Sequence, residues 1–300
     1  MKVFSPGKLL LTSEYVVLDG ALALAIPTKL GQEGHFCEIN DGKAMVHWEA
    51  YHQDKLWLKV DLNYQTNEIL SANLNEPALF VQKVISIIRQ HSSVVLQNNH
   101  SYQIKTNLQF PSNFGLGSSS TLMNNLATWA RIDAFSLNEM ALGGSGYDIA
   151  IAQQKSAILF QNVEGRKQIE KIDFNPPFKD ELIFIHLNQK QDSREGINLY
   201  KSKIKSKEVI ESFSELTNSI LETNSIEEFS QLISFHEKNI SKLINLPTVK
   251  EKFFADAPVF FKSLGAWGGD FILSKRFDNY KNYFQNKGYS TIFTYNDLIL

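Results

Sequence analysis

A group of glycines and serines stands where the chain changes from one regular pattern to another. The stretch FPSNFGLGSSSTLMNN covers residues 110–125 and holds two glycines followed by three consecutive serines. Such small residues between a strand and a helix let another backbone or a ligand come close. The first turn of a helix leaves N–H groups unpaired at the positive end of its dipole. The sequence therefore predicts an anion-binding loop over residues 115–120; the alternative is a structural turn with helix-capping serines.

This loop differs from the two most familiar phosphate-binding sequences. A Walker A loop, GxxxxGK[ST], requires a lysine that GLGSSS lacks, and GLGSSS does not match GxGxxG either. The loop by itself therefore indicates an anion but does not identify the molecule that carries it.

Hydrophobic periodicity predicts the elements that position the loop. Residues 102–110 alternate apolar and polar side chains, which is typical of a strand with one buried face. Beyond the glycines, residues 122–130 place apolar side chains at helical spacing, and residues 78–89 do the same after Pro77. The loop is therefore expected to join a strand to a helix, with a further helix packed on the sheet.

Other segments are also assigned from their patterns. An Asp-Gly pair at 19–20 separates two apolar runs, which favours a hairpin, and the Pro-Pro pair at 176–177 precedes LIFIHL, a predicted strand. Helices are predicted over 207–221 and 226–244. His236 lies on the apolar stripe of the second of these helices, and we expect a core histidine there rather than a ligand, since the seven histidines show no zinc-binding spacing.

Composition limits the class of partner. The chain has 300 residues, 43% of them hydrophobic, which suits two moderate domains. A net charge of -2 gives no electrostatic reason to expect a nucleic acid or a membrane surface, so a small molecule is the expected partner. Cys37 is the only cysteine, and MKVFSPGKLL lacks the features of a secretory signal. These observations predict a cytoplasmic protein without a disulfide framework.

Three stretches together resemble the signature motifs of a known superfamily. SPGKLLLTSEYVVLDG, FPSNFGLGSSS and KSLGAWGGDFIL follow the order and separation of the three motifs of the GHMP small-molecule kinases, which include galactokinase, homoserine kinase, mevalonate kinase and phosphomevalonate kinase. GGSGYDIA, at residues 143–150, looks like the segment with the catalytic aspartate of mevalonate-type kinases. The resemblance implies an α+β fold. Residues 1–179 would form an ATP-binding domain with a left-handed βαβ crossover, and residues 180–300 a ferredoxin-like domain.

The resemblance also implies roles for individual residues in binding ATP and Mg²⁺ and in catalysis. The positions that match the family's ATP-binding loop are Pro111, Gly115, Leu116, Gly117, Ser118, Ser119 and Ser120. Ser119 would also hold Mg²⁺, together with Glu139. Lys8 would lie near the transferred phosphoryl group, and Asp148 would orient or deprotonate the acceptor. The alternatives are a solvated lysine, a helix-capping aspartate and a surface glutamate.

Substrate-facing positions are implied in three segments. They are Glu14, Tyr15, Lys190, Ser193, Arg194, Gly265 and Gly268. A solvated charged loop is the alternative for NQKQDSREG, at residues 188–196. Two positions depart from the family pattern, because Ser13 and Trp267 each replace a glycine. Trp267 is expected either to cover the phosphate loop or to fill a domain interface.

The expected activity is that of an ATP- and Mg²⁺-dependent kinase of the mevalonate branch. Glu14-Tyr15 and Asp270 look like phosphomevalonate kinases, whereas SGYD resembles mevalonate kinases, and the first resemblance favours phosphomevalonate as acceptor. Two alternatives stay open: a nucleotide-binding protein that kept the fold without the chemistry, and an enzyme similar to diphosphomevalonate decarboxylase. A homodimer is compatible with each of them.

Overall fold

The structure is a computed structural model that describes residues 1–189, 193–265 and 267–300, and the side chains of residues 193–195 lie outside the description. Its contacts divide the chain into two compact units. The first unit comprises Met1–Gly7, Leu30–Ser112 and Gly117–Lys155, and the second comprises Lys8–Lys29, Asn113–Leu116 and Ser156–Leu300. These units interleave along the sequence. The predicted domains, residues 1–179 and 180–300, are consecutive segments, and that assignment stays a prediction.

The first unit is built on a mixed sheet. Its strands are β1 (Lys2–Leu10), β2 (Ala23–Ile39), β3 (Met45–His52), β4 (Lys55–Asn63), β5 (Glu68–Ala72) and β6 (Ser101–Leu108), of which β1 and β2 continue into the second unit. The order is β5-β4-β3-β6-β2, and β1 also pairs with β2. Strands β3 and β6 are parallel, whereas β2 and β6 are antiparallel. The predicted strand over residues 102–110 is β6.

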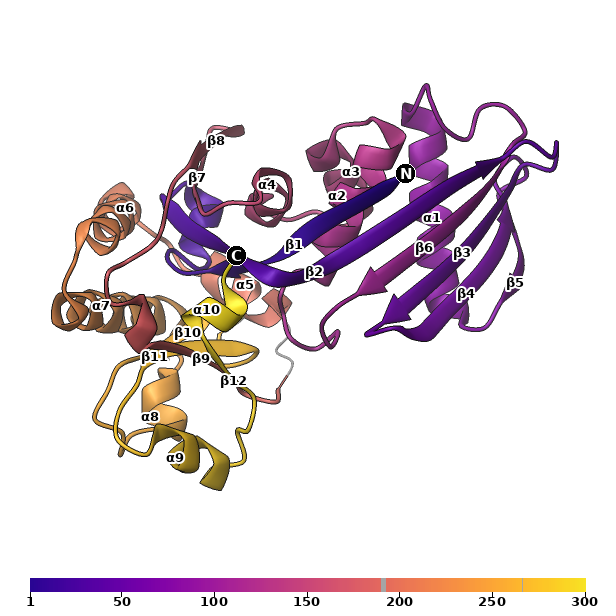
Figure 1. Cartoon of the computed structure of the whole chain (residues 1–300). Helices are drawn as coiled ribbons and strands as arrows, with labels where there is room; N and C mark the ends of the chain where they lie inside the picture. Colours follow the sequence, from indigo (N-terminus) through magenta and orange to yellow (C-terminus); the bar gives the residue numbers. More distant parts are fainter. Residues whose placement is uncertain (190–192, 266) are drawn as a thin grey trace. The chain divides into compact units, whose positions relative to one another are not determined.

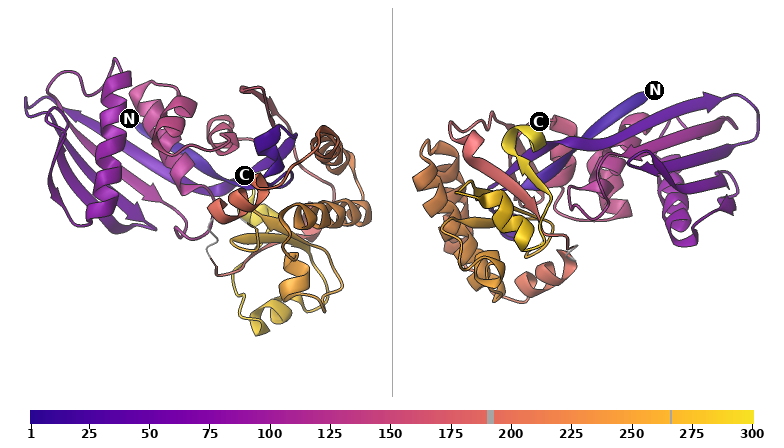
Figure 2. Two further views of the ribbon diagram at one scale, coloured as in Figure 1. Left: turned by 180° about the vertical axis from the view of Figure 1, so that it is seen from behind. Right: turned by 60° about the horizontal axis from the view of Figure 1, so that its bottom comes forward.

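Helices cover one face of this sheet. They are α1 (Asn75–His91), α2 (Ser118–Ala130), α3 (Ala134–Ala141) and α4 (Tyr147–Gln154). Helix α1 crosses the strands, as Figures 1 and 2 show. Trp48, Ile85, Ile104 and Leu126 from the sheet, α1 and α2 belong to one buried core. The apolar stripes predicted over 78–89 and 122–130 are confirmed as α1 and α2, and the buried faces of both belong to this core.

The second unit contains a four-stranded antiparallel sheet with the order β10-β11-β9-β12. The strands of that sheet are β9 (Leu182–His186), β10 (Phe261–Leu264), β11 (Phe271–Lys275) and β12 (Ile292–Thr294). The unit also contains β7 (Ile158–Val163) and β8 (Arg166–Lys171), and β7 pairs antiparallel both with β8 and with the start of β2, so the larger sheet continues in the order β2-β7-β8. Its helices are η1 (Val16–Asp19), η2 (Lys179–Glu181), α5 (Ser193–Lys201), α6 (Lys207–Glu222), α7 (Ile226–Ile244), α8 (Val249–Phe253), α9 (Tyr280–Asn286) and α10 (Tyr295–Leu298). The predicted strand LIFIHL and the two predicted helices, now α6 and α7, are confirmed.

The predicted hairpin turn at Asp19-Gly20 was wrong. Strand β1 ends at Leu10 and β2 begins at Ala23, and a 3-10 helix, Val16–Asp19, lies in the loop between them. The two strands pair, but not through a two-residue turn. The reason is burial: Val16 and Val17 are both buried, and Val16 belongs to a core cluster of the second unit together with Tyr200 and Trp267.

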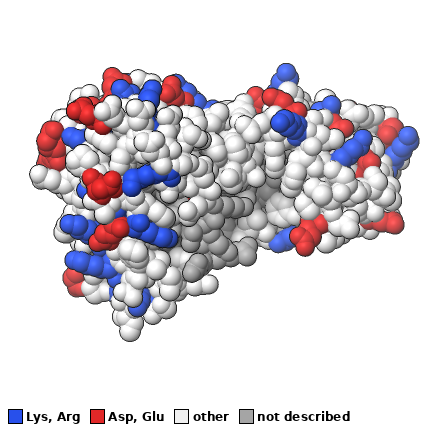
Figure 3. All heavy atoms as spheres, turned by 90° about the horizontal axis from the view of Figure 1, so that it is seen from below, with Lys and Arg blue, Asp and Glu red and all other residues white. Residues whose placement is uncertain are grey.

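The surface carries charges of both signs. On the face drawn in Figure 3, acidic and basic side chains are interspersed rather than collected into one patch. This distribution agrees with the net charge of -2. Among the described residues, we find no helix with the length and apolar character that a membrane crossing requires.

Candidate active site

The glycine-serine loop has the backbone of a helix-start anion site. Gly115 and Gly117 adopt left-handed φ angles of 69° and 83°, and Gly117 is the N-cap of α2. The Thr121 N–H and the Ser120 hydroxyl both donate to the Gly117 carbonyl, at 3.0 and 2.9 Å. The hydroxyl of Ser120 therefore helps to start the helix. The N–H groups of the first helical turn are those that an α-helix leaves without an intrahelical acceptor, which is the arrangement that binds anions.

Lys8 lies against this loop. It is half-buried on β1, and its Nζ donates to the Gly115 carbonyl at 3.0 Å. Its backbone N–H donates to the Leu116 carbonyl at 2.9 Å. Two hydrogen bonds thus fix Lys8 beside the start of the loop, so the structure brings together two parts of the predicted site that are 107 residues apart in sequence.

The second glycine-rich turn, residues 265–270, lies against the glycine-serine loop at Gly115. Gly265 and Gly268 have left-handed φ angles of 85° and 75°, and Asp270 follows with a φ of 52°. A Cβ built on Gly115 would overlap the Asp270 carboxylate, so only glycine fits at that position. Asp270 is 7% exposed. In the sequence, Asp270 bore only on the choice of acceptor, whereas the structure places its carboxylate directly against the loop.

Asp148, Glu139 and Ser119 belong to the first unit. Asp148 is half-buried in the first turn of α4, after Gly146, and its Oδ1 accepts from the Ile149 N–H at 3.0 Å. A helix N-terminus favours an ionised carboxylate there. Glu139 on α3 and Ser119 on α2 are exposed. Within the described residues, no three His, Cys, Asp or Glu side chains gather into a metal-binding group. The roles of these three residues stay predictions.

The predicted substrate-facing residues have different surroundings. Lys190 lies outside the described residues, and Ser193 and Arg194 begin α5 with side chains that are not described. The Tyr15 hydroxyl accepts from the Trp267 N–H at 2.9 Å. It also lies so close to Gly196 of α5 that a Cβ there would overlap it.

Trp267 fills the interior of the second unit. It is 5% exposed and shares a core cluster with Tyr15 and Tyr200. Its Nε1 donates to the Pro247 carbonyl at 3.0 Å. A large side chain with one polar atom is thus both packed and hydrogen-bonded, as a buried tryptophan requires.

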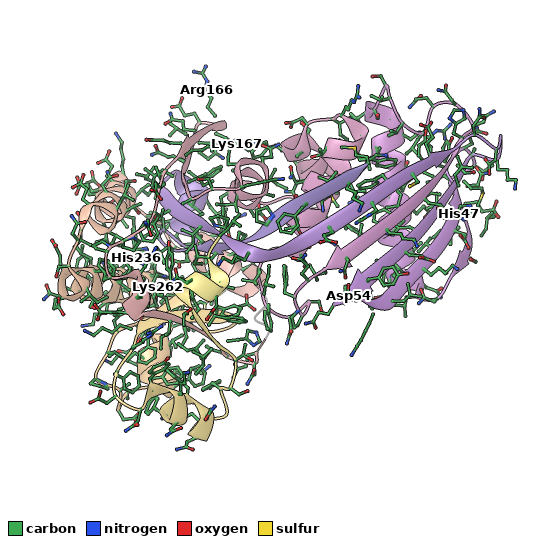
Figure 4. The ribbon with its side chains drawn as sticks, in the orientation of Figure 1. His47, Asp54, Arg166, Lys167, His236 and Lys262 are labelled. Carbon is green, nitrogen blue, oxygen red and sulfur yellow. The ribbon has the colours of Figure 1, made fainter. Side chains whose placement is uncertain are left out.

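Glu14 lies in a buried ionic cluster that the sequence did not reveal. Its carboxylate accepts a hydrogen bond from Lys262 Nζ on β10, and Lys262 also lies 3.3 Å from Glu237 Oε2 on α7. His236 lies beside them, with Nε2 3.7 Å from Glu14 Oε2. Figure 4 shows Lys262 close to His236. All four residues are at most 2% exposed. The one signal in the sequence was a lysine inside an apolar strand, VFFKSL.

Burial shifts the titration of this cluster. It raises the pKa of Glu14 to about 7, against the lowering effect of the Lys262 ammonium, and it also raises the pKa of Glu237. The pKa of His236 lies well below its ordinary value, because burial and then Lys262 both oppose a second positive charge. The Ser13 N–H donates to His236 Nε2 at 2.7 Å, which agrees with a neutral ring. The predicted core position of His236 is confirmed.

Comparisons with known proteins define the fold. No family model matches the sequence, and a search of curated proteins finds no match. Solved structures do match over nearly the whole length, and those described below are GHMP kinases. The chain has the two-domain GHMP kinase fold, as expected from its motifs.

Three matched structures illustrate the similarity. A phosphomevalonate kinase from Streptococcus pneumoniae, solved with phosphomevalonate and AMPPNP, is 18% identical with a TM-score of 0.71, covering 98% of this chain and 99% of that chain. A mevalonate kinase from Methanococcus jannaschii is 17% identical with a TM-score of 0.69, and the coverage is 98% and 96%. A galactokinase from Lactococcus lactis, complexed with galactose, is 12% identical with a TM-score of 0.65, and the coverage is 98% and 92%.

Proposed function

We propose that this protein is an ATP-dependent small-molecule kinase of the GHMP type that acts in the mevalonate pathway of isoprenoid biosynthesis. The observation that carries the proposal is the hydrogen bond from Lys8 to Gly115, at a glycine loop that leads into a helix N-terminus. This arrangement suits a phosphate group, because backbone N–H groups and a fixed ammonium both favour negative charge. The AMPPNP in the S. pneumoniae structure supports ATP as the nucleotide.

The proposed reaction is an in-line phosphoryl transfer. An acceptor oxygen attacks the γ-phosphorus of ATP, the bond from that phosphorus to the β,γ-bridging oxygen breaks, and ADP leaves. Lys8 would stabilise the charge on the phosphoryl oxygens. Asp148 would orient the acceptor and, where the acceptor is a hydroxyl, remove its proton.

Mg²⁺ is the proposed metal, with Ser119 and Glu139 as its protein ligands. Kinases bind Mg²⁺ through few protein groups, since the nucleotide phosphates and water supply the other ligands. An exposed hydroxyl at a helix start and an exposed carboxylate fit that ligand chemistry. The bound ion would neutralise charge on the nucleotide phosphates.

Phosphomevalonate is the acceptor we favour. Its reacting oxygen belongs to a phosphate that is already ionised, so it needs cations more than a base. Lys190 and Arg194 would supply them together with Lys8. We expect Arg194→Ala to lower kcat/KM more with phosphomevalonate than with mevalonate. Arg166→Ala, at an exposed arginine on β8, is the matched control.

An acceptor screen tests the proposed function. The protein is incubated with Mg-ATP and mevalonate, phosphomevalonate, diphosphomevalonate, galactose or homoserine, and ADP release and product mass are measured. ADP release that depends on phosphomevalonate, with a product one phosphoryl group heavier, is the expected result. Loss of CO₂ from diphosphomevalonate would identify a decarboxylase instead. ATP binding without turnover of any acceptor would favour a non-catalytic protein. A cytoplasmic location and a homodimer complete the proposal.

A further inference from the structure

The buried cluster of Glu14, His236, Glu237 and Lys262 joins three separate segments of the second unit. Glu14 comes from the loop after β1, His236 and Glu237 from α7, and Lys262 from β10. Glu237 also accepts from the N–H and the hydroxyl of Ser263, at 3.1 and 2.7 Å. Lys262 donates to the Ser263 carbonyl at 2.6 Å. The cluster therefore holds one loop to one helix and one strand.

The charges of the cluster do not balance when every acid is ionised. The neutral His236 leaves two carboxyl groups facing one ammonium, so a single proton shared by Glu14 and Glu237 makes the set neutral. Glu237 Oε2 lies 3.3 Å from Lys262 Nζ, whereas Glu14 Oε2 has no hydrogen-bond donor within the described part of the chain. The raised pKa values of both glutamates agree with a bound proton near neutral pH.

Stability alone is a poor explanation for such a cluster. Taking charges out of water carries a large desolvation penalty, and well-packed apolar residues often replace a buried ion pair without loss of stability. Buried ionic groups in some proteins specify one conformation instead.

The loop that carries Glu14 has an unfavourable backbone. Ser13 and Tyr15, on either side of Glu14, have φ angles of 61° and 64°, a region that non-glycine residues seldom occupy. The Ser13 N–H donates to His236 Nε2, and the Ser13 hydroxyl donates to the Leu22 carbonyl at 2.7 Å. Such a conformation persists only when its surroundings impose it. Here the surroundings include the cluster and these two bonds.

The same loop fixes the second glycine-rich turn. Tyr15 accepts from the Trp267 N–H through its hydroxyl, and Trp267 lies between Gly265 and Asp270. Asp270 in turn lies against Gly115 of the phosphate loop. Lys262 thus holds Glu14 of the 13–15 loop, and Tyr15 of the same loop accepts a hydrogen bond from the turn that follows β10.

We propose that Lys262 is a positioning residue: by holding Glu14 and Glu237 it sets the left-handed 13–15 loop and, through Tyr15, the backbone of the turn that carries Asp270. The consequence of this positioning for catalysis rests on the proposed function, since that turn contacts the proposed phosphate loop. The positioning itself is measurable without any turnover.

The test uses a triple variant, Lys262→Met/Glu14→Gln/Glu237→Gln, which removes the charges and keeps side chains of similar size. We expect it to unfold at a temperature close to that of the natural protein, since no buried charge is left unpaired. Amide hydrogen exchange in segments 12–16 and 264–270 should nevertheless become faster by roughly two- to tenfold, as expected for lost hydrogen bonds. Exchange in α2 and β6 should not change.

Lys250→Met is the matched control. Lys250, on α8 of the same unit, donates to the Val259 carbonyl at 2.7 Å and is not part of the cluster. Its variant should leave exchange in segments 12–16 and 264–270 unchanged. Unchanged exchange of both segments in the triple variant, or equal acceleration throughout the second unit, would overturn the proposal.

Tyr15→Phe supplies a second measurement if the triple variant does not fold. It keeps the aromatic ring and removes the hydroxyl that accepts from the Trp267 N–H. Faster exchange in segment 264–270 supports the proposal, and unchanged exchange there overturns it. With a phosphorylated acceptor, both variants should lower kcat/KM. If the natural protein shows no kinase activity, the proposed function fails while the exchange experiment still decides the role of Lys262.

Discussion

The side-chain ammonium of Lys8 donates a 3.0 Å hydrogen bond to the carbonyl oxygen of Gly115. One end of the first strand is thereby tied to the first glycine of the loop that leads into α2. A lysine held in this way presents a fixed positive charge at the loop, whereas a solvated lysine would be free to move.

Removal of the Lys8 ammonium should impair catalysis. We expect Lys8→Met to lower kcat by about 10²- to 10³-fold, the effect typical of losing one preorganised charge-stabilising group. Steady-state ADP release with the accepted substrate is the measurement. Lys2→Met, at an exposed lysine on the same strand, should remain close to the natural rate. Equal rates for the two variants would remove Lys8 from the catalytic site.

Gly115 should tolerate no side chain. We expect Gly115→Ala to cost about 2–4 kcal/mol of unfolding free energy. The new Cβ would displace the Asp270 carboxylate, and alanine is strained in the left-handed conformation of Gly115. Denaturant unfolding and ATP binding are both measured, and both should be weakened.

Gly42→Ala separates the two causes. Gly42 has nearly the same φ, 70°, but a Cβ there would meet nothing within 4 Å. This control should cost only about 1–2 kcal/mol, the strain of the left-handed backbone. An equal loss in both variants would show that the approach of Asp270 to Gly115 has no energetic importance.

Asp148 should matter for turnover more than for nucleotide binding. We expect Asp148→Asn to lower kcat with a hydroxyl acceptor by about 10²- to 10⁴-fold, the usual contribution of a general base. The Kd for ATP should change little. Asp133→Asn is the control, since Asp133 caps α3 in the same unit and asparagine caps equally well. A kcat of Asp148→Asn equal to that of the natural protein would exclude Asp148 as the general base.

The buried cluster should make stability depend on pH. The pKa of Glu14 is raised to about 7, above the 4.5 expected in the unfolded chain. Its contribution is therefore fully present below about pH 4.5 and is lost as the pH rises through about 7. We expect the unfolding free energy to fall over this interval, and to fall less steeply in Glu14→Gln. Glu215→Gln, at an exposed glutamate on α6, should keep the natural slope. If the unfolding free energy fell equally steeply with pH in the natural protein, Glu14→Gln and Glu215→Gln, the raised pKa of Glu14 would be contradicted.

Local patterns determined much of the fold from the sequence by itself. The alternation over residues 102–110 and the apolar stripes of α1, α2, α6 and α7 predicted these elements correctly, because their periodicity reports which face is buried. The order and spacing of the glycine-rich motifs also predicted the α+β fold that the solved structures share. The prediction of a hairpin turn at Asp19-Gly20 was wrong, because the burial of Val16 in a core with distant residues outweighed a local turn preference.

Only the tertiary structure revealed the contacts that hold the site. Glu14 and Lys262 are 248 residues apart, and Lys8 and Gly115 are 107 apart. The sequence showed a lysine in an apolar strand but not its partners, and it presented Glu14 as a substrate-facing residue. Whether a charged side chain is solvated or buried depends on which distant segments pack around it. Burial and pairing are therefore set by the complete fold, because desolvation and Coulomb attraction act through space rather than along the chain.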